Sequence, residues 1–154
     1  MKTPLRIGVA LSLAISLIIP LRAQQLPLDK DTLQNLIEES DLIISGKVTG
    51  TEQPGDGTTR VNLRVKEIFK GATPDGETVT VVVPGGSQNG SPDPVVVKGQ
   101  PAFQEKEQVI VFLRVIRDYF EVSQGRVGKR AGVGREAQIL ESGIKKYMAK
   151  KPLL

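Results

Sequence analysis

Short segments in which apolar and polar residues alternate, separated by clusters of glycine and proline, fill the chain from residue 42 to residue 123. The clearest are 42–51, 60–65 and 78–83. Alternation with a period of two places one set of side chains on each face of a strand, so these segments predict half-buried β-strands. Helical spacing occurs only before and after this region. The pattern therefore restricts the chain to a mainly β fold with helices at its ends.

The strand pattern also predicts a core. Gln108 to Val115 forms the most apolar strand, and its unbroken run 109–113 indicates burial on both faces. The alternation slips at Glu67-Ile68, which is typical of a β-bulge. A last strand at 119–123 completes a hairpin. We expect a small antiparallel barrel or sandwich. Eight residues should meet in its interior: Val61, Leu63, Val65, Val111 and Leu113, with Leu42, Ile44 and Val48 opposite them.

Two amphipathic helices are expected outside the strand region. The first covers Asp29 to Ser40, with Asp29 or Asp31 as its N-cap. The second covers Arg135 to Lys150. Each helix has apolar residues at helical spacing. They are Leu33, Leu36 and Ile37 in the first helix and Leu140, Ile144, Tyr147 and Met148 in the second.

Residues 1–23 have the pattern of a secretory signal peptide. Lys2 and Arg6 precede an apolar run, Ile7 to Ile19, and a cleavage site before Gln24 follows Pro20. The run is shorter than the ~20 residues that span a bilayer. Retention of the segment as an N-terminal anchor is the alternative, and the lack of cysteine excludes a lipid anchor. We expect an exported protein, periplasmic or secreted, from a bacterial host.

The remainder of the chain is expected to form a barrel domain at 24–125, including the first helix, and a basic tail at 126–154. The barrel domain has 10 basic and 15 acidic residues, whereas the tail has 8 basic and 2 acidic residues. A tail of this charge suits an anionic surface such as lipid headgroups, and a solvated helix face is the alternative. We expect residues 125–134 to form a mobile connector. The candidate basic patch comprises Arg126, Lys129, Arg130, Lys145 and Lys146.

The chain contains neither histidine nor cysteine. Ser-His-Asp triads, cysteine nucleophiles and zinc sites with the usual ligands are therefore excluded. The Ser142 to Lys145 segment has the Ser-x-x-Lys spacing but lacks the motifs that accompany it in penicillin-binding enzymes. Only four Phe, two Tyr and no Trp are present, which argues against base stacking on nucleic acid. We expect a protein that is not an enzyme and that has no cofactor and no metal site.

The longest candidate loop runs from Pro84 to Phe103 and is rich in polar residues, glycine and proline. Loops at the rim of a barrel are common binding sites. The residues of this candidate binding loop are Pro84, Gly85, Gly86, Ser87, Gln88, Asn89, Asp93 and Phe103.

The segments Ser40 to Gly50 and Val61 to Gly71, the latter ending in Ile-Phe-Lys-Gly, resemble the first hairpin of netrin-like domains. The likeness is strongest to the N-terminal domain of tissue inhibitors of metalloproteinases. The chain is also similar to uncharacterised bacterial exported proteins that have a Pro-Gly-Gly segment and an apolar Phe-Leu strand. Here these are Pro84-Gly85-Gly86 and Phe112-Leu113. The resemblance implies a five-stranded oligonucleotide/oligosaccharide-binding (OB) type barrel.

The resemblance does not extend to the mechanism of the inhibitors. They chelate the catalytic metal of the protease through an N-terminal cysteine, which this chain lacks. We expect an exported, non-enzymatic binding module for a protein partner in the envelope or medium. One alternative is a regulator or inhibitor of an extracellular metalloprotease that binds through its loops. Another is a peripheral envelope protein whose basic tail docks on anionic lipid.

Overall fold

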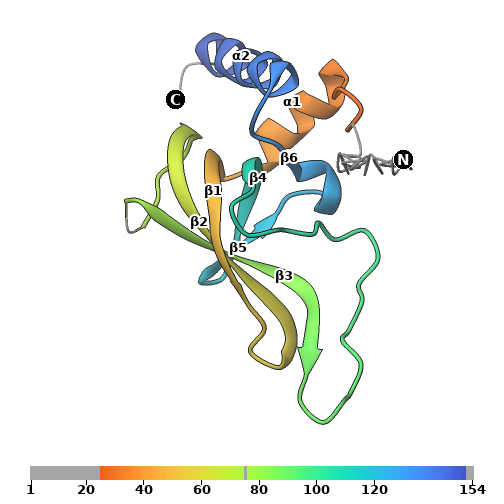
Figure 1. The fold of residues 1–154 in the computed structure, drawn as a ribbon. Helices are drawn as coiled ribbons and strands as arrows, with labels where there is room; N and C mark the ends of the chain where they lie inside the picture. The colour runs from red at the N-terminus through yellow and green to blue at the C-terminus, as the bar shows by residue number, and fades with distance from the viewer. Residues whose placement is uncertain (1–24, 75, 152–154) are drawn as a thin grey trace, which may run out of the picture.

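The computed structural model describes residues 25–74 and 76–151; the predicted leader lies outside this range. A curved sheet forms the body of the molecule, and two helices pack at one end of it (Figure 1). The elements in chain order are α1 (Lys30–Glu39), β1 (Leu42–Glu52), β2 (Asp56–Lys70), β3 (Thr78–Gln88), β4 (Gln108–Ile116), β5 (Tyr119–Val122), the 3₁₀ helix η1 (Gly125–Gly128), β6 (Lys129–Ala131) and α2 (Arg135–Lys150). The chain is therefore mainly β, as the alternation predicted.

The six strands form one sheet in the order β1-β2-β3-β5-β4-β6. An additional pairing between β1 and β4 closes the sheet partly into a ring. The β3–β5 link is a single parallel pair, Val81 with Phe120, whereas the other strand pairings are antiparallel. The sheet is thus mixed, which corrects the expectation of a purely antiparallel one. β3 runs in the direction of β1, because both are antiparallel to β2. β5 also runs in that direction, because β4 is antiparallel to both β1 and β5. β3 and β5 are therefore parallel where they meet.

The interior of the ring holds one apolar cluster, here called the interior cluster. Seven of the eight predicted interior residues belong to it, and Val65 is half-buried against it. This confirms the predicted register, because a shift by one residue would have turned these side chains outward. The cluster consists of Leu42, Ile44, Val48, Val61, Leu63, Val79, Val81, Val83, Val109, Val111, Leu113 and Val122.

A second cluster, here called the helix-side cluster, lies between the outer face of β1 and β4 and the two helices. From the strands it takes Ile43, Ile110 and Phe112, each with no exposed surface. From the helices it takes Leu36, Ile37, Ala137 and Ile144. The run 109–113 is therefore buried on both faces, as predicted. The first half of β1 is also buried on both faces, rather than on one, because the helices cover it.

Both helices match the sequence expectation. Asp29 is the N-cap of α1, and its Oδ1 accepts a hydrogen bond of 2.9 Å from the backbone N–H of Thr32. Helix α2 covers the predicted range. Its apolar side chains Leu140, Tyr147 and Met148 lie half-buried against the helix-side cluster. The apolar stripe of the tail is therefore used for packing within the molecule.

The predicted β-bulge in β2 is present. The pairing with β1 passes from Ile68 to Lys70 and from Val65 to Glu67, which leaves Phe69 and Lys66 without a partner on β1. The bulge turns Phe69 toward the helix-side cluster. Gly71 follows with φ +81°, and a Cβ there would stand 2.3 Å from the carbonyl oxygen of Asp41. The Ile-Phe-Lys-Gly motif therefore shapes the junction between sheet and helices.

Two expectations about loops are corrected. Strand β3 continues to Gln88, so Pro84 to Gln88 is not a loop; Thr58 pairs with Pro84 and Asp56 with Gln88. The expected mobile connector instead contains η1 and β6, and β6 pairs with the first half of β4. Glycines in 84–88 and charged residues in 129–131 give these segments a low intrinsic preference for the strand conformation. Backbone hydrogen bonds to a neighbouring strand stabilise the extended conformation in both places.

Candidate functional site

The predicted binding loop divides into two parts in the structure. Its first residues extend β3, and Gly86 exchanges two backbone hydrogen bonds with Val95 (2.9 and 2.7 Å). Phe103 is half-buried and packs against the interior cluster. The exposed part lies between them, where Val96 is 88% exposed. In Figure 1 the connection from β3 to β4 begins at the end of the sheet remote from α1 and α2 and runs back beside the sheet toward β4.

The remaining residues predicted for this loop lie at or near its tip. Asn89 and Asp93 are exposed, and the backbone N–H of Asn89 donates to the carbonyl of Gly55 at 2.8 Å. The side chain of Asn89 fills the space beside Gly55. The structure therefore brings Asn89 next to the β1–β2 turn.

The predicted basic patch is dispersed over different surroundings. The Nζ of Lys129 lies 2.7 Å from Glu107 Oε1 and 4.9 Å from the ring centre of Phe103. Lys145 pairs with Glu67 on β2 at 2.8 Å. Arg126 donates to the carbonyl of Gln100 at 3.3 Å. Each of these three cations has a local partner. Arg126 and Lys129 both bind the segment 100–107, whereas Lys145 binds β2, so the three do not form one continuous basic patch.

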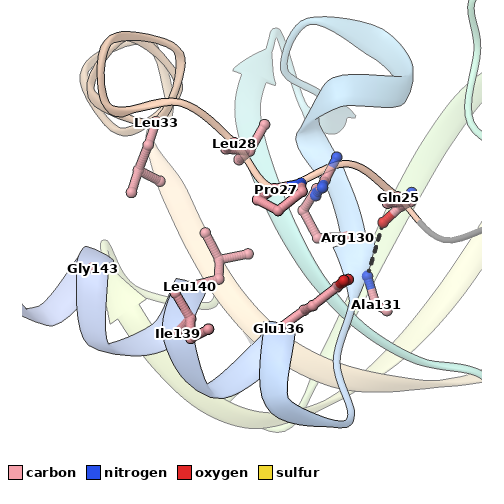
Figure 2. Close-up of a pocket in the computed structure, with 10 residues that line it drawn as sticks. All are labelled: Gln25, Pro27, Leu28, Leu33, Arg130, Ala131, Glu136, Ile139, Leu140 and Gly143. Atoms are coloured by element: carbon pink, nitrogen blue, oxygen red, sulfur yellow. Dashed lines mark hydrogen bonds between the residues drawn. The ribbon is translucent and has the colours of Figure 1, made fainter.

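Of the two other patch residues, Lys146 is exposed on α2, and Arg130 lies at a different feature. This feature is a hollow of about 190 Å³ between the segment 25–28, α1, β6 and α2, here called the helix hollow (Figure 2). Its lining is mainly apolar. The lining residues are Gln25, Pro27, Leu28, Leu33, Arg130, Ala131, Glu136, Ile139, Leu140 and Gly143.

The helix hollow exists because α2 and α1 do not meet along their full length. Gly143 has no side chain, and a Cβ at this position would stand 3.1 Å from Leu33. This close approach joins the helices at one end. At the other end the N-terminal segment covers the gap, where Gln25 binds β6: its Oε1 accepts from the N–H of Ala131 and its Nε2 donates to the carbonyl of Lys129, both at 3.2 Å.

Arg130 and Glu136 give the helix hollow a polar edge. The guanidinium of Arg130 donates to the backbone carbonyl of Leu26. Burial lowers the pKa of Arg130, and the nearby charge of Glu136 partly opposes this shift. Figure 2 shows both side chains between the N-terminal segment and α2. The apolar interior of the hollow suits an apolar side chain of a peptide segment. The cation and the anion at its edge suit the polar backbone of the same segment.

This hollow has almost no signature in the amino-acid sequence. Ile139 falls outside the apolar stripe of α2 and is 62% exposed, and Leu26 is 83% exposed. An isolated exposed Ile or Leu is ordinary on a protein surface. The sequence feature that indicates the hollow is Ile139, an apolar residue directly before Leu140, which makes the apolar face of α2 wider at this end of the helix.

The described residues provide neither a cluster of metal ligands nor a membrane-spanning helix. No group of three or more acidic, histidine or cysteine side chains is arranged there to bind a metal ion. None of the helices in 25–74 and 76–151 has the length and apolar character needed to cross a membrane.

Comparison with known proteins does not assign a family. No protein-family model matches the chain, and no curated protein matches it significantly.

Proposed function

We propose that the protein is an exported, non-enzymatic binding module that holds an apolar side chain of a partner protein in the helix hollow. The observation that carries this proposal is the hollow itself, with its apolar lining and its Arg130–Glu136 edge. Its volume of about 190 Å³ is below the ~300–1,000 Å³ that is typical of small-molecule sites. A single side chain of a peptide segment matches this size better than a cofactor does.

We further propose that the partly closed ring is an OB-type barrel related to netrin-like domains. Five strands, β1, β2, β3, β5 and β4, succeed one another around the ring, and such barrels are five-stranded and partly open. The motif residues of the resemblance support the same idea, because they hold the helices on the sheet. Ser40, for example, donates to the carbonyl of Leu36 at 2.6 Å and lies 2.9 Å from the hydroxyl of Ser123.

A loop-mediated regulator of an extracellular protease is the second candidate. Its support is the exposed apolar pair on the β3–β4 connection, Val96 and Val97, which are 88% and 39% exposed. The lipid-docking alternative is less well supported, because the apolar stripe of α2 packs on the sheet and three of the predicted patch cations have local partners.

Site-specific photo-crosslinking can separate the first two candidates. A photoreactive amino acid is placed at Ile139 in one preparation and at Val96 in another, and each is incubated with envelope extract. We expect a discrete crosslinked partner from position 139 only. A second probe at the neighbouring position Gln138 reports the effect of substitutions. With this probe, Ile139→Asp should abolish capture of the partner, and Val96→Asp should leave capture unchanged. Both changes affect exposed side chains, so the fold should be preserved. Capture from position 96 alone would reject the helix hollow in favour of the loop.

A further inference from the structure

Ser45 on β1 is the only buried side chain of the described residues whose polar atom has no hydrogen-bond partner. The residue is 4% exposed. Leaving a buried hydroxyl unpaired costs about 1–3 kcal/mol, so such a group in a native fold calls for a specific explanation. Ser45 pairs with Ile110 of β4, a member of the helix-side cluster, and therefore lies on the outer face of the sheet.

A hollow of about 340 Å³ opens at Ser45, here called the sheet hollow. Two glycines set its shape. A Cβ at Gly46 would stand 2.6 Å from the carbonyl oxygen of Arg64, and a Cβ at Gly132 would stand 2.6 Å from the backbone nitrogen of Val109. Both glycine backbones therefore lie tightly against neighbouring backbone at the edge of the sheet hollow, where no side chain would fit. The lining residues are Ser45, Gly46, Lys47, Arg64, Val65, Lys66, Gln108, Val109 and Gly132.

The charges around the sheet hollow have one sign. Lys47 pairs directly with Arg64 on β2 and with Gln108 on β4, so these three side chains form one row across the outer face. Lys66, at the bulge, adds a third cation. Like charges directly opposite each other destabilise a sheet unless something offsets their repulsion. Within the described residues, none of the three cations has a carboxylate within 4.0 Å.

The nearest carboxylate in the strand register does not neutralise this row. Glu67 pairs with Ser45 across β1 and β2, but its Oε1 forms an ion pair of 2.8 Å with Lys145 of α2. Glu67 is not part of the lining of the sheet hollow. The lining thus offers three positive charges, one amide and one unpaired hydroxyl, and no acid.

We propose that the sheet hollow binds a tetrahedral oxyanion, the phosphate or sulfate group of a ligand. The hydroxyl of Ser45 is covered by neighbouring atoms in this structure. In the proposed complex the side chains around it shift, the hydroxyl donates to one oxygen of the group, and the amide of Gln108 supplies a second donor. Lys47, Arg64 and Lys66 balance its charge, and a hydrogen bond to a charged group is about twice as strong as one between neutral groups. This site is separate from the helix hollow and does not depend on the proposed function.

Calorimetric titration of the purified protein with inorganic phosphate, and in parallel with sulfate, tests the site. We expect one saturable site at low ionic strength that weakens with added sodium chloride. Ser45→Ala and Lys47→Gln should each weaken binding about tenfold or more, as loss of a hydrogen bond or charge to an anion implies. The matched control Lys98→Gln, an exposed lysine on the β3–β4 connection, should leave the affinity within about twofold of the wild type.

Thermal melting distinguishes binding from folding. Without phosphate, Ser45→Ala should melt no lower than the wild type, because the hydroxyl has no partner in the fold. With phosphate, only the wild type and Lys98→Gln should gain substantially in melting temperature. Absence of saturable phosphate or sulfate binding overturns the proposal, and so does binding that survives both Ser45→Ala and Lys47→Gln. A clear loss of stability in Ser45→Ala without phosphate also overturns it.

Co-sedimentation with lipid vesicles shows whether the bound phosphate belongs to a lipid headgroup or to a soluble ligand. Co-sedimentation with phosphatidylglycerol but not phosphatidylcholine vesicles, lost in Ser45→Ala and Lys47→Gln, assigns the phosphate to a lipid headgroup. Phosphate binding without co-sedimentation assigns it to a soluble ligand.

Discussion

Lys70 shows how one side chain can join two elements. Its Nζ donates to the backbone carbonyls of Ile37 and Ser40, at 2.7 and 2.5 Å, and these are among the carbonyls left unpaired at the end of α1. A cation at the C-terminus of a helix also interacts favourably with the helix dipole. The residue lies at the end of β2, so the bond fixes α1 on the sheet.

The leucines of the interior cluster provide the first prediction. Leu63 and Leu113 have no exposed surface, and replacing either by alanine should cost about 2–5 kcal/mol of the free energy of unfolding. Val115→Ala is the matched control, because this side chain is 49% exposed and should cost less than about 1 kcal/mol. Urea denaturation measures all three. Losses below about 1 kcal/mol at both leucines would show that the register described here is wrong.

At the scale of elements, the second prediction concerns the contact between the ends of α1 and α2. The hydroxyl of Tyr147 and the Nζ of Lys151 both donate to Glu38 Oε1. These bonds lower the pKa of Glu38 below its ordinary value of 4.5. The stabilisation is therefore complete above pH 4.5 and is lost as the pH falls through the lowered pKa of the folded state.

Thermal melts of the wild type and Glu38→Gln between pH 7 and pH 3 test this linkage. Glu38→Gln should melt below the wild type at pH 7, and the difference should shrink as the pH approaches 3. Glu52→Gln, which removes an exposed carboxylate on β1, should show no such pattern. A difference between wild type and Glu38→Gln that is constant down to pH 3 would contradict the assignment.

The third prediction concerns α2 as a whole. A chain ending at Gly134 retains every strand but uncovers Ile43, Ile110 and Phe112, which have no exposed surface in the full fold. We expect it to melt at a clearly lower temperature. Ile144→Ala tests the same packing with the helix retained and should cost about 2–5 kcal/mol, because Ile144 is fully buried. If the shortened chain melts at the temperature of the full chain, α2 does not stabilise the sheet.

At the scale of the whole molecule, the two hollows lie at different places on the same sheet. The helix hollow lies between the two helices and β6, and the sheet hollow lies on the outer face of β1, β2 and β4. The helix hollow is apolar with one cation, Arg130, and one anion, Glu136, at its edge. The charged side chains that line the sheet hollow are all basic. A binding module with both could hold a partner segment and an anionic group at the same time.

The fourth prediction concerns export. Expression in a bacterial host should release a chain that begins at Gln24, because residues 1–23 have the pattern of a cleaved leader. Intact-mass spectrometry of the exported fraction measures the start directly. Recovery of the protein in the membrane fraction with Met1 to Ala23 still attached would support the alternative of a retained anchor.

The sequence by itself determined most of the strands, both α-helices and the interior register. Alternation of period two is a local property, and it correctly placed Leu63 and Leu113 in one interior. Helical spacing placed Ile144 on the buried face of α2 in the same way. The β-bulge near Glu67-Ile68 was also predicted from the sequence, because a bulge interrupts the alternation of apolar and polar residues at that point.

Only the tertiary structure decided the strand assignments of 84–88 and 129–131 and the positions of both hollows. Pro84-Gly85-Gly86 and Lys129-Arg130-Ala131 have no strand pattern of their own, and they are extended because β2 and β4 offer free backbone groups. The row of Arg64, Lys47 and Gln108 is contributed by three strands that are distant in sequence. Local periodicity carries no information about such neighbours, because strand order and register are fixed only when the whole core packs.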